Sequence, residues 1–280
     1  MGFFRRKKDP AQNLAEALGD ADLPSFSSVV FQVLEALRGG EASPKEIGEL
    51  ISSDPGLSLR LLKMANSAAY GERRIQSAVH AVVLMGPRPV ESLVLSVAVR
   101  DSLPLEPARG FVAARFWRSA ARRATLAQGL ARHLHPATAA MSFTAALLQD
   151  MAVPLLAHSQ GEVYGELLEK WHEEGGDLAV LERAVAGWDH AEVAGWLCES
   201  WNFPPALTKA ISRHHDIDSE GVPPAVGLVA LLGEGKEKPG MDALVETARD
   251  RFQLSPEKLR ATVERSLQEA EELGQLFVGE

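Results

Sequence analysis

Hydrophobic residues recur at steps of three and four along most of the chain, which is the period of an amphipathic helix. Leu57, Leu61, Met64, Ala65 and Ala68 give one clear example. No segment alternates apolar and polar residues with the period of two that marks a half-buried strand, and no short unit repeats. The pattern predicts an all-α fold.

Several predicted helices begin with recognisable local signals. Ser43 is followed by Pro44 and, three residues on, by Glu46, which together form an N-cap, a first-turn proline and a capping box. Asp54 with a following proline repeats the signal, and Ser77 can cap the next helix. These signals predict helices that start near 44, 55 and 78.

A Pro/Gly-rich stretch, "LPLEPARG" at 103–110, divides the helical pattern. We expect a flexible basic N-terminal tail over 1–20, a helical lobe over 21–104 and a second lobe over 111–216. The remaining residues, 217–280, are acidic, and we expect a helical extension that packs on the second lobe.

Composition excludes several classes of protein. Of 280 residues, 46% are hydrophobic and 24% are charged, which is ordinary for a soluble globular chain. A single cysteine, Cys198, allows no internal disulfide and fits the cytoplasm. The net charge of −9 argues against non-specific DNA binding. No apolar run approaches the roughly 20 residues that span a bilayer, so we expect no integral membrane segment.

The usual catalytic motifs are absent, and candidate chemistry rests on scattered acids and histidines. There is no glycine-rich phosphate loop, no GxSxG and no HExxH, and no cofactor is predicted. Asp150, His190, His214 and His215 are the residue types that bind divalent metals when separate helices bring them together. The alternative is that these histidines have purely structural roles near helix ends, where they interact with the helix dipole.

Asp150 lies in the middle of the apolar run "FTAALLQDMAVPLLAH", which predicts a helix that ends near Pro154. An unpaired buried carboxylate is strongly penalised, so this residue needs an explanation. We favour an ion pair or hydrogen-bond cluster with Arg118, Arg122 or His190. A vestigial metal or ligand pocket and simple exposure to solvent are the alternatives.

Six further residues are candidates for partner contacts. Arg115, Arg118 and Arg122 have i, i+3, i+7 spacing on one helix face, which suits either solvent or an acidic partner. The other three, Asp54, Asn66 and Tyr70, have structural explanations as well, in capping, backbone bonding and ring packing.

Six segments, in order along 23–215, resemble the HDOD domain. The most specific is "DPGLSLRLLKMANSAAYG"; the others are "LPSF…VLEAL", "IQSAVHAVVLMGPRPVESLVLSVAV", "FWRSAARRATLAQGLA", "TAALLQDMAVPLL" and "WDHAEVAGWLCESWNFPPALTKAISRHH". This family is a metal-poor relative of the HD and HD-GYP phosphohydrolases. The resemblance implies an all-helical bacterial signalling domain of the cytoplasm that is generally not an enzyme.

The chain departs from the HD enzymes at two metal-ligand positions. Residues 116–131, where those enzymes carry a first histidine, contain none, and the adjacent His-Asp pair reads Gln149-Asp150. His190, His214 and His215 resemble later histidines of the HD-GYP relatives. A two-metal site therefore looks dismantled, although one ion remains conceivable.

We therefore expect a non-enzymatic signalling regulator that acts by binding a protein partner. A cyclic dinucleotide is a further ligand to consider, without local support in the sequence. The alternative function is a metal-dependent phosphohydrolase or phosphodiesterase with a reduced site.

Overall fold

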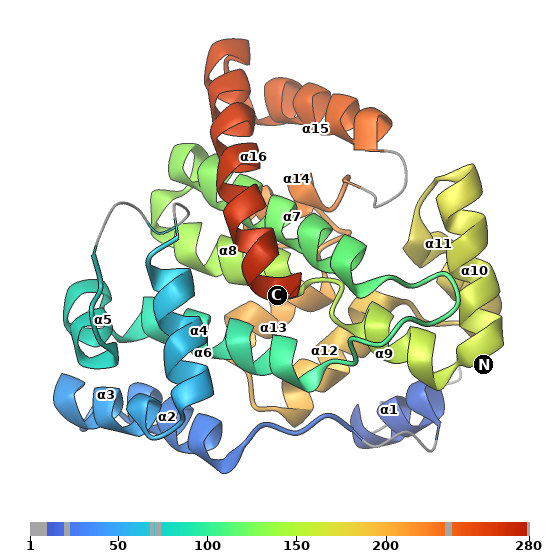
Figure 1. The fold of residues 1–280 in the computed structure, drawn as a ribbon. Coiled ribbons are helices and arrows are strands. Elements are labelled where there is room, and N and C mark those ends of the chain that lie inside the picture. Colours follow the sequence, from blue (N-terminus) through green and yellow to red (C-terminus); the bar gives the residue numbers. More distant parts are fainter. Residues whose placement is uncertain (1–9, 20–22, 68–69, 71–73, 233–236, 279–280) are drawn as a thin grey trace, which may run out of the picture.

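The computed structural model describes residues 10–19, 23–67, 70, 74–232 and 237–278, which fold into helices joined by short connections. These residues contain no β-strand, and their one isolated bridge joins Ala108 and Phe111. The all-α prediction is confirmed. The helices of Figure 1 are α1 (Pro10–Leu18), α2 (Ser28–Gly39), α3 (Pro44–Ser52), α4 (Pro55–Ala65), α5 (Ala78–Met85), α6 (Pro87–Ser102), α7 (Ala113–Leu134), η2 (Pro136–Thr138), α8 (Ala139–Leu148), α9 (Ala152–Ser159), α10 (Gly161–Glu174), α11 (Leu178–Ala186), α12 (His190–Ser200), α13 (Pro205–Ser212), α14 (Pro224–Val229), α15 (Glu237–Phe252) and α16 (Pro256–Val278).

Side-chain caps fix several helix starts. Ser43 caps α3 in a capping box, in which its hydroxyl accepts from the N–H of Glu46 and the Glu46 carboxylate accepts from the N–H of Ser43. Asp54 caps α4 through the N–H of Leu57. Each such cap typically contributes about 1 kcal/mol. Because the signal is local, the starts at 44 and 55 follow from the sequence.

The N-terminal helices α2 to α6 pack closely on one another. At the contact of α3 with α5, a Cβ on Gly48 would lie 2.4 Å from Val79 Cγ2, so a larger residue would force the two helices apart. Their apolar core continues without a break into α7, α8, α9, α12 and α13. The two halves of the chain therefore share one core.

The apolar run around Asp150 is not one helix, as the sequence pattern suggested, but two. α8 ends at Leu148, and α9 begins at Ala152. Pro154 explains the break, because its nitrogen carries no hydrogen and its ring clashes with the carbonyl four residues back. That carbonyl belongs to Asp150, and it accepts instead from the N–H of Val153 at 2.9 Å. Asp150 thus lies at a bend rather than within a helix.

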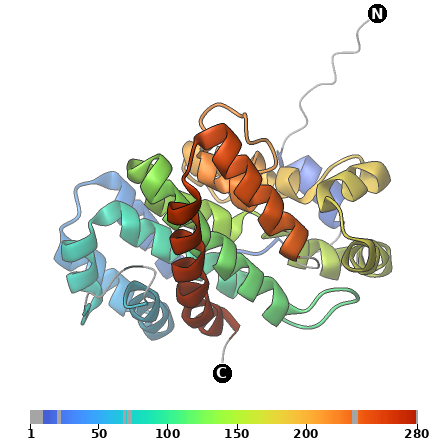
Figure 2. The ribbon, with the colours of Figure 1, turned by 90° about the horizontal axis from the view of Figure 1, so that it is seen from above.

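The C-terminal helix α16 lies along α7 (Figure 1), and the view from above shows α15 and α16 on the same side of the molecule (Figure 2). The Thr125 hydroxyl donates to the carbonyl of Ser266 at 2.8 Å, and the Ser266 hydroxyl donates back to the carbonyl of Thr125. Trp117 stacks on Phe277 with ring centroids 5.0 Å apart. A second core cluster joins α7, α8, α14, α15 and α16.

The region expected to be a flexible tail, 1–20, contains a packed helix. α1 buries Leu14, Ala17 and Leu18 and contacts α12 and α9. The carbonyl of Ala17 also accepts from the side-chain amide of Gln160. The basic residues that motivated the expectation lie within 1–9, outside the described residues.

One segment of the described chain, Pro136–Ser159, has the length and apolar composition of a membrane span. It comprises η2, α8 and α9, and 78% of its apolar window is buried inside the protein. A mostly buried core helix passes the same test of length and composition, so the segment is weak evidence for membrane insertion.

Candidate functional site

Asp150 is the centre of a buried polar cluster. Its Oδ2 lies 2.7 Å from Nη2 of Arg123, and its Oδ1 lies 3.4 Å from Nε2 of both His190 and His214. The carboxylate is 16% exposed, and the three partners are almost fully buried. The bend between α8 and α9 therefore places one carboxylate against α7, α12 and the end of α13.

Arg123, rather than Arg118 or Arg122, makes the arginine ion pair that the sequence led us to expect. It follows Ala120 on the apolar stripe of α7, so its side chain enters the core and is only 2% exposed. Nη1 donates to the Ser119 hydroxyl at 3.1 Å. Within the described part of the chain, Nε of Arg123 has no hydrogen-bond partner, and Nη2 makes the ion pair with Asp150.

His190 is held by a second buried acid that the sequence analysis missed. Its Nδ1 lies 2.6 Å from Oε2 of Glu182, and because a carboxylate only accepts, this ring nitrogen donates. The backbone N–H of His190 donates to the same oxygen, and the Tyr164 hydroxyl donates to the other carboxylate oxygen. Glu182 lies on the buried face of α11 with Leu178, four residues earlier. An acidic residue on an otherwise apolar helix face was the sequence signal that could have identified it.

His214 and His215 complete the cluster at the end of α13. Nδ1 of His214 lies 2.7 Å from the carbonyl of Ile211 and therefore donates. In the neutral ring, Nε2 then carries no proton and offers a lone pair. That nitrogen is buried and has no hydrogen-bond partner among the described residues. Nε2 of His215 lies 3.0 Å from Nε2 of His190, so one of these two nitrogens carries the shared proton.

The charges of this cluster balance. Burial by itself raises the pKa of Asp150, but the charge of Arg123 and the hydrogen bond of His190 hold it well below 3.8. Burial likewise lowers the pKa of His190, but Glu182 and Asp150 outweigh burial and raise it well above 6.5. An imidazolium and a guanidinium thus face two carboxylates.

The other two imidazoles are neutral. Burial, followed by the charge of neighbouring His215, lowers the pKa of His214 well below 6.5. The pKa of His215 is lowered by burial and by the charge of His190. Neutral imidazole is the form that serves as a metal ligand or hydrogen-bond acceptor.

The donor set does not suit a two-metal centre. A bridging carboxylate needs both oxygens, and Arg123 lies against one oxygen of Asp150. The residue next to it is Gln149, whose amide is a poorer metal ligand than neutral imidazole. One ion is a different case, because ligand nitrogens of His190, His214 and His215 lie within 4.8 Å of one another. The lone pair of His214 Nε2 and the Glu182 contact of His190 are features of histidine metal ligands.

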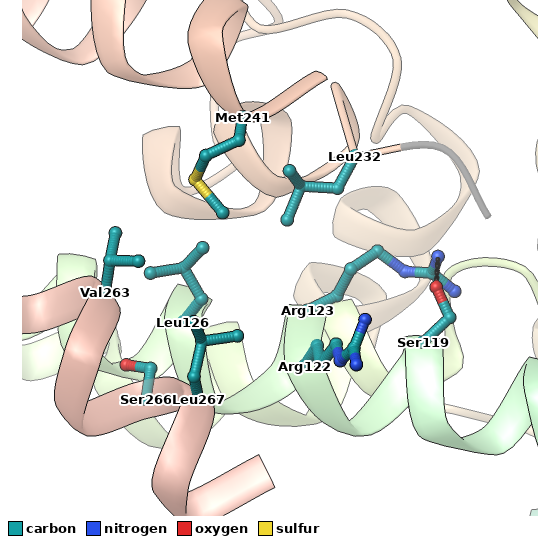
Figure 3. A pocket seen from close by; sticks show the side chains of 9 residues that line it. All are labelled: Ser119, Arg122, Arg123, Leu126, Leu232, Met241, Val263, Ser266 and Leu267. Atoms are coloured by element: carbon teal, nitrogen blue, oxygen red, sulfur yellow. Dashed lines mark hydrogen bonds between the residues drawn. The ribbon is translucent and has the colours of Figure 1, made fainter. Parts of the chain in front are cut away.

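The cluster forms the floor of a cleft with a volume of about 470 Å³. Arg123, Gln149, Asp150, His190 and His215 are among the residues that line it. Arg123 also borders a smaller cavity, in which Leu126, Met241 and Val263 form the opposite end (Figure 3).

The three arginines expected on one face of α7 lie near different elements. Arg115 donates to the carbonyl of Gly110 and lies 3.2 Å from Nδ1 of His172 on α10. Arg118 lies beside Gly274 of α16, and Arg122 lines the small cavity. The structure therefore does not gather them into one patch.

The remaining candidates have structural roles in the described residues. Asp54 caps α4. The Asn66 side chain donates to the carbonyl of Ile75 and accepts from its N–H, so it braces the connection after α4. Tyr70 packs edge-on against Phe143, with ring centroids 5.1 Å apart, and burial raises its pKa. None of the three lies in the cleft.

Solved structures with this fold support the architecture. A Shewanella amazonensis SB2B protein, provisionally named a phosphohydrolase, has a TM-score of 0.69 at 23% identity, over 96% of this chain and 97% of its own. A Geobacter sulfurreducens HDOD domain protein of unknown function scores 0.63 at 20% identity, over 93% and 90%. A Marinobacter aquaeolei VT8 protein, provisionally named for signal transduction, scores 0.66 at 20% identity, over 97% and 62%.

Sequence comparison gives the family. An uncharacterized protein of Treponema pallidum (strain Nichols) is 28% identical over 225 residues. The match covers 78% of this chain and 43% of that protein, so the chain spans less than half of its curated relative. A family model of the HDOD domain matches residues 23–217. The chain belongs to the HDOD domain family.

Proposed function

We propose that this chain is a non-catalytic signal-transduction regulator whose HD-derived site binds rather than hydrolyses. The observation that carries the proposal is the 2.7 Å contact between Arg123 and Asp150. A guanidinium is a permanent cation, so the carboxylate that would attract a divalent ion already has a counter-charge. Bringing an ion to that oxygen would require moving a buried arginine.

The cluster is suited to relaying a binding event. It joins α7, the bend between α8 and α9, α11, α12 and the end of α13 through contacts of Arg123, Asp150, Glu182, His190 and His214. A ligand that shifts Asp150 changes a partner of three other buried groups at once, those of Arg123, His190 and His214. Such a network can have two discrete arrangements, which is what coupling between sites requires.

A protein partner has room at the junction of the two halves. One open groove of about 510 Å³ is lined by Phe31 and Arg38 of α2 and by Trp201. Another, of about 540 Å³, is lined by Leu105 and the end of α9. Phe31 is 46% exposed and Leu105 is 38% exposed, and partly exposed apolar residues beside grooves are typical of partner contacts.

Metal content and hydrolysis test the proposal. The full chain is purified without chelators, analysed for iron, manganese and zinc, and assayed on bis(p-nitrophenyl) phosphate and cyclic diguanosine monophosphate with millimolar Mn²⁺. We expect substoichiometric metal and no hydrolysis above that of Asp150→Asn. Stoichiometric metal together with hydrolysis that is lost in Asp150→Asn would overturn the proposal.

A phosphohydrolase with a reduced metal site is the second candidate, and Nε2 of His214, which has no hydrogen-bond partner among the described residues, favours it. His190, His214, His215 and the near oxygen of Asp150 would hold one ion, which when bound would activate water for attack on a phosphoester. Glu182 would orient His190 through its Nδ1 proton. This candidate predicts that Glu182→Gln weakens Mn²⁺ binding about 10-fold or more, measured by calorimetry.

A further inference from the structure

The cleft above Asp150 is completed by residues beyond the part of the chain that matches the family. The match ends at 217, and six later residues line the cleft: Gly227, Ala230, Leu231, Leu232, Thr247 and Arg251. They come from α14, from the segment that follows it, and from α15. The C-terminal extension therefore lines this space together with the HD-derived cluster.

The extension and the HD-derived cluster contribute different chemistry to the lining of the cleft. Leu231 and Leu232, together with Ile217, give the extension an apolar surface. The HD-derived cluster contributes polar, buried side chains, with Arg123 1% exposed and Gln149 2% exposed. A ligand that fills the cleft therefore meets both apolar surface and a few hydrogen-bonding groups, as is usual in small-molecule sites.

Buried polar atoms on the floor lack partners within the described part of the chain. They are Nε of Arg123, which is a donor, and Oε1 of Gln149, which is an acceptor, whereas Nη2 of Arg123 faces Asp150. A buried donor or acceptor left unpaired costs about 1–3 kcal/mol. An oxyanion would satisfy the Nε donor of Arg123, and an N–H or O–H group on the same molecule would satisfy Gln149.

The acidic side chains that line the cleft already have hydrogen-bond or ion-pair partners, and these partners reduce their repulsion of a bound anion. Asp150 faces Arg123 and His190, and the carboxylate of Asp177 accepts from the N–H of Ala179. At the rim, Arg251 of α15 forms an ion pair with Asp218. Both of these side chains are substantially exposed, at 43% and 72%, and such surface pairs contribute little to stability. Arg251 can therefore exchange Asp218 for a ligand.

We propose that this cleft binds a small organic oxyanion, a phosphate or a carboxylate on a compact apolar body, between Arg251 and the Arg123–Gln149 floor. The apolar body lies against Leu231 and Leu232. This inference rests on the proposed function, since it assigns a ligand to the same non-catalytic site. It makes the C-terminal extension the part of the chain that selects the ligand.

The test uses the full chain and four probes in titration calorimetry: adenosine 5′-monophosphate, indole-3-acetate, inorganic phosphate and adenosine. We expect saturable binding of the monophosphate or of the indole carboxylate, and tighter binding than that of phosphate or adenosine alone. The two organic anions separate a phosphate ligand from a carboxylate ligand. Failure of all four probes to bind saturably would overturn the inference.

Variants on α15 locate the site. Arg251→Gln should weaken the bound probe at least 10-fold, whereas Arg249→Gln, on the same helix and paired with Asp250 in solvent, should not change it. Asp218→Asn releases Arg251 and should tighten binding. Equal affinity in wild type and Arg251→Gln would overturn the inference. Release of phosphate from the monophosphate by the wild type would instead contradict the proposed function and leave the binding site standing.

Discussion

Nη2 of Arg123 lies 2.7 Å from Oδ2 of Asp150, and these two side chains join α7 to the bend between α8 and α9. The bend exists because Pro154 cannot donate to the carbonyl of Asp150, and the arginine reaches the bend because it occupies the apolar face of its helix. Pro154 thus positions the carboxylate at the bend, and Arg123 neutralises its charge. The two features together give Asp150 a counter-charge from the protein itself.

The energy of this ion pair can be measured with a double-mutant cycle. Asp150→Asn leaves a buried guanidinium without its counter-charge, and Arg123→Met leaves the carboxylate with histidine partners only. We expect each change to lower the free energy of unfolding by about 3–5 kcal/mol. In urea denaturation, the double variant should lose at least about 1 kcal/mol less than the sum of the two.

Arg118→Met serves as the control for the cycle. Arg118 is exposed on the same helix, so its replacement should change stability by less than about 0.5 kcal/mol. Additive losses for Arg123 and Asp150 would show that the two side chains are close but not coupled.

A second prediction concerns metal binding in a redesigned cluster. The double variant Arg123→Ala/Gln149→His removes the guanidinium and adds an imidazole beside Asp150. We expect it to bind Zn²⁺ or Mn²⁺ at least tenfold more tightly than the wild type, because three further imidazoles lie close by. Calorimetry gives the affinity, and the rise in Tm with added ion gives an independent reading. The variant Arg122→Ala/Gln149→His keeps Arg123 and should gain less, and equal gains would contradict the competing role of Arg123.

The third prediction is a stability maximum near pH 6.5 in metal-free protein. The raised pKa of His190 gives a contribution that is complete below 6.5 and is lost as pH rises through the folded-state pKa. The lowered pKa values of His214 and His215 act oppositely, since their contribution is present above 6.5 and falls as the unfolded chain takes up protons. Each unmatched proton changes the free energy of unfolding by up to about 1.4 kcal/mol per pH unit.

Variants separate the two limbs of this pH profile. His190→Gln should remove the decline above pH 6.5, and His135→Gln, at an exposed histidine, should leave the whole profile unchanged. The measurement is urea denaturation at intervals between about pH 5 and pH 9 after dialysis against chelator. A decline above pH 6.5 that persists in His190→Gln would assign it to other groups.

Helix positions were the part of the fold that the sequence predicted well, because caps act within a few residues. Ser43, Asp54 and Ser77 begin helices at the expected places. The break at Asp150 was also readable, since a proline four residues on disrupts the carbonyl bond, but the apolar run concealed it. α1 was missed because its short apolar face becomes informative only against its partners α12 and α9.

The candidate site was predicted in part. Asp150, His190, His214 and His215 do converge, although they lie on separate elements. Arg123 was not identified as the partner, because the spacing of its neighbours drew attention to the exposed face of α7. Buried charges of this kind are visible only as exceptions to an apolar stripe. The contribution of α14 and α15 to the cleft depends on tertiary packing, which no local pattern records.

The last prediction concerns the attachment of the extension to α7. A Cβ on Gly129 would lie 2.8 Å from Thr262 Cγ2 and 2.9 Å from Ser266 Oγ of α16, which is closer than such contacts allow. Gly129→Ala should therefore lower the free energy of unfolding by about 1–3 kcal/mol, although alanine favours helices. Gly39→Ala is the matched control, because a Cβ there meets nothing within 4 Å and the change should be neutral or stabilising by up to about 1 kcal/mol. If the inferred ligand site is correct, Gly129→Ala should also weaken the bound probe, since α16 and α15 form one side of the molecule and α15 carries Arg251. Unchanged stability in Gly129→Ala, measured by urea denaturation, would show that the extension is not held against α7 at this point.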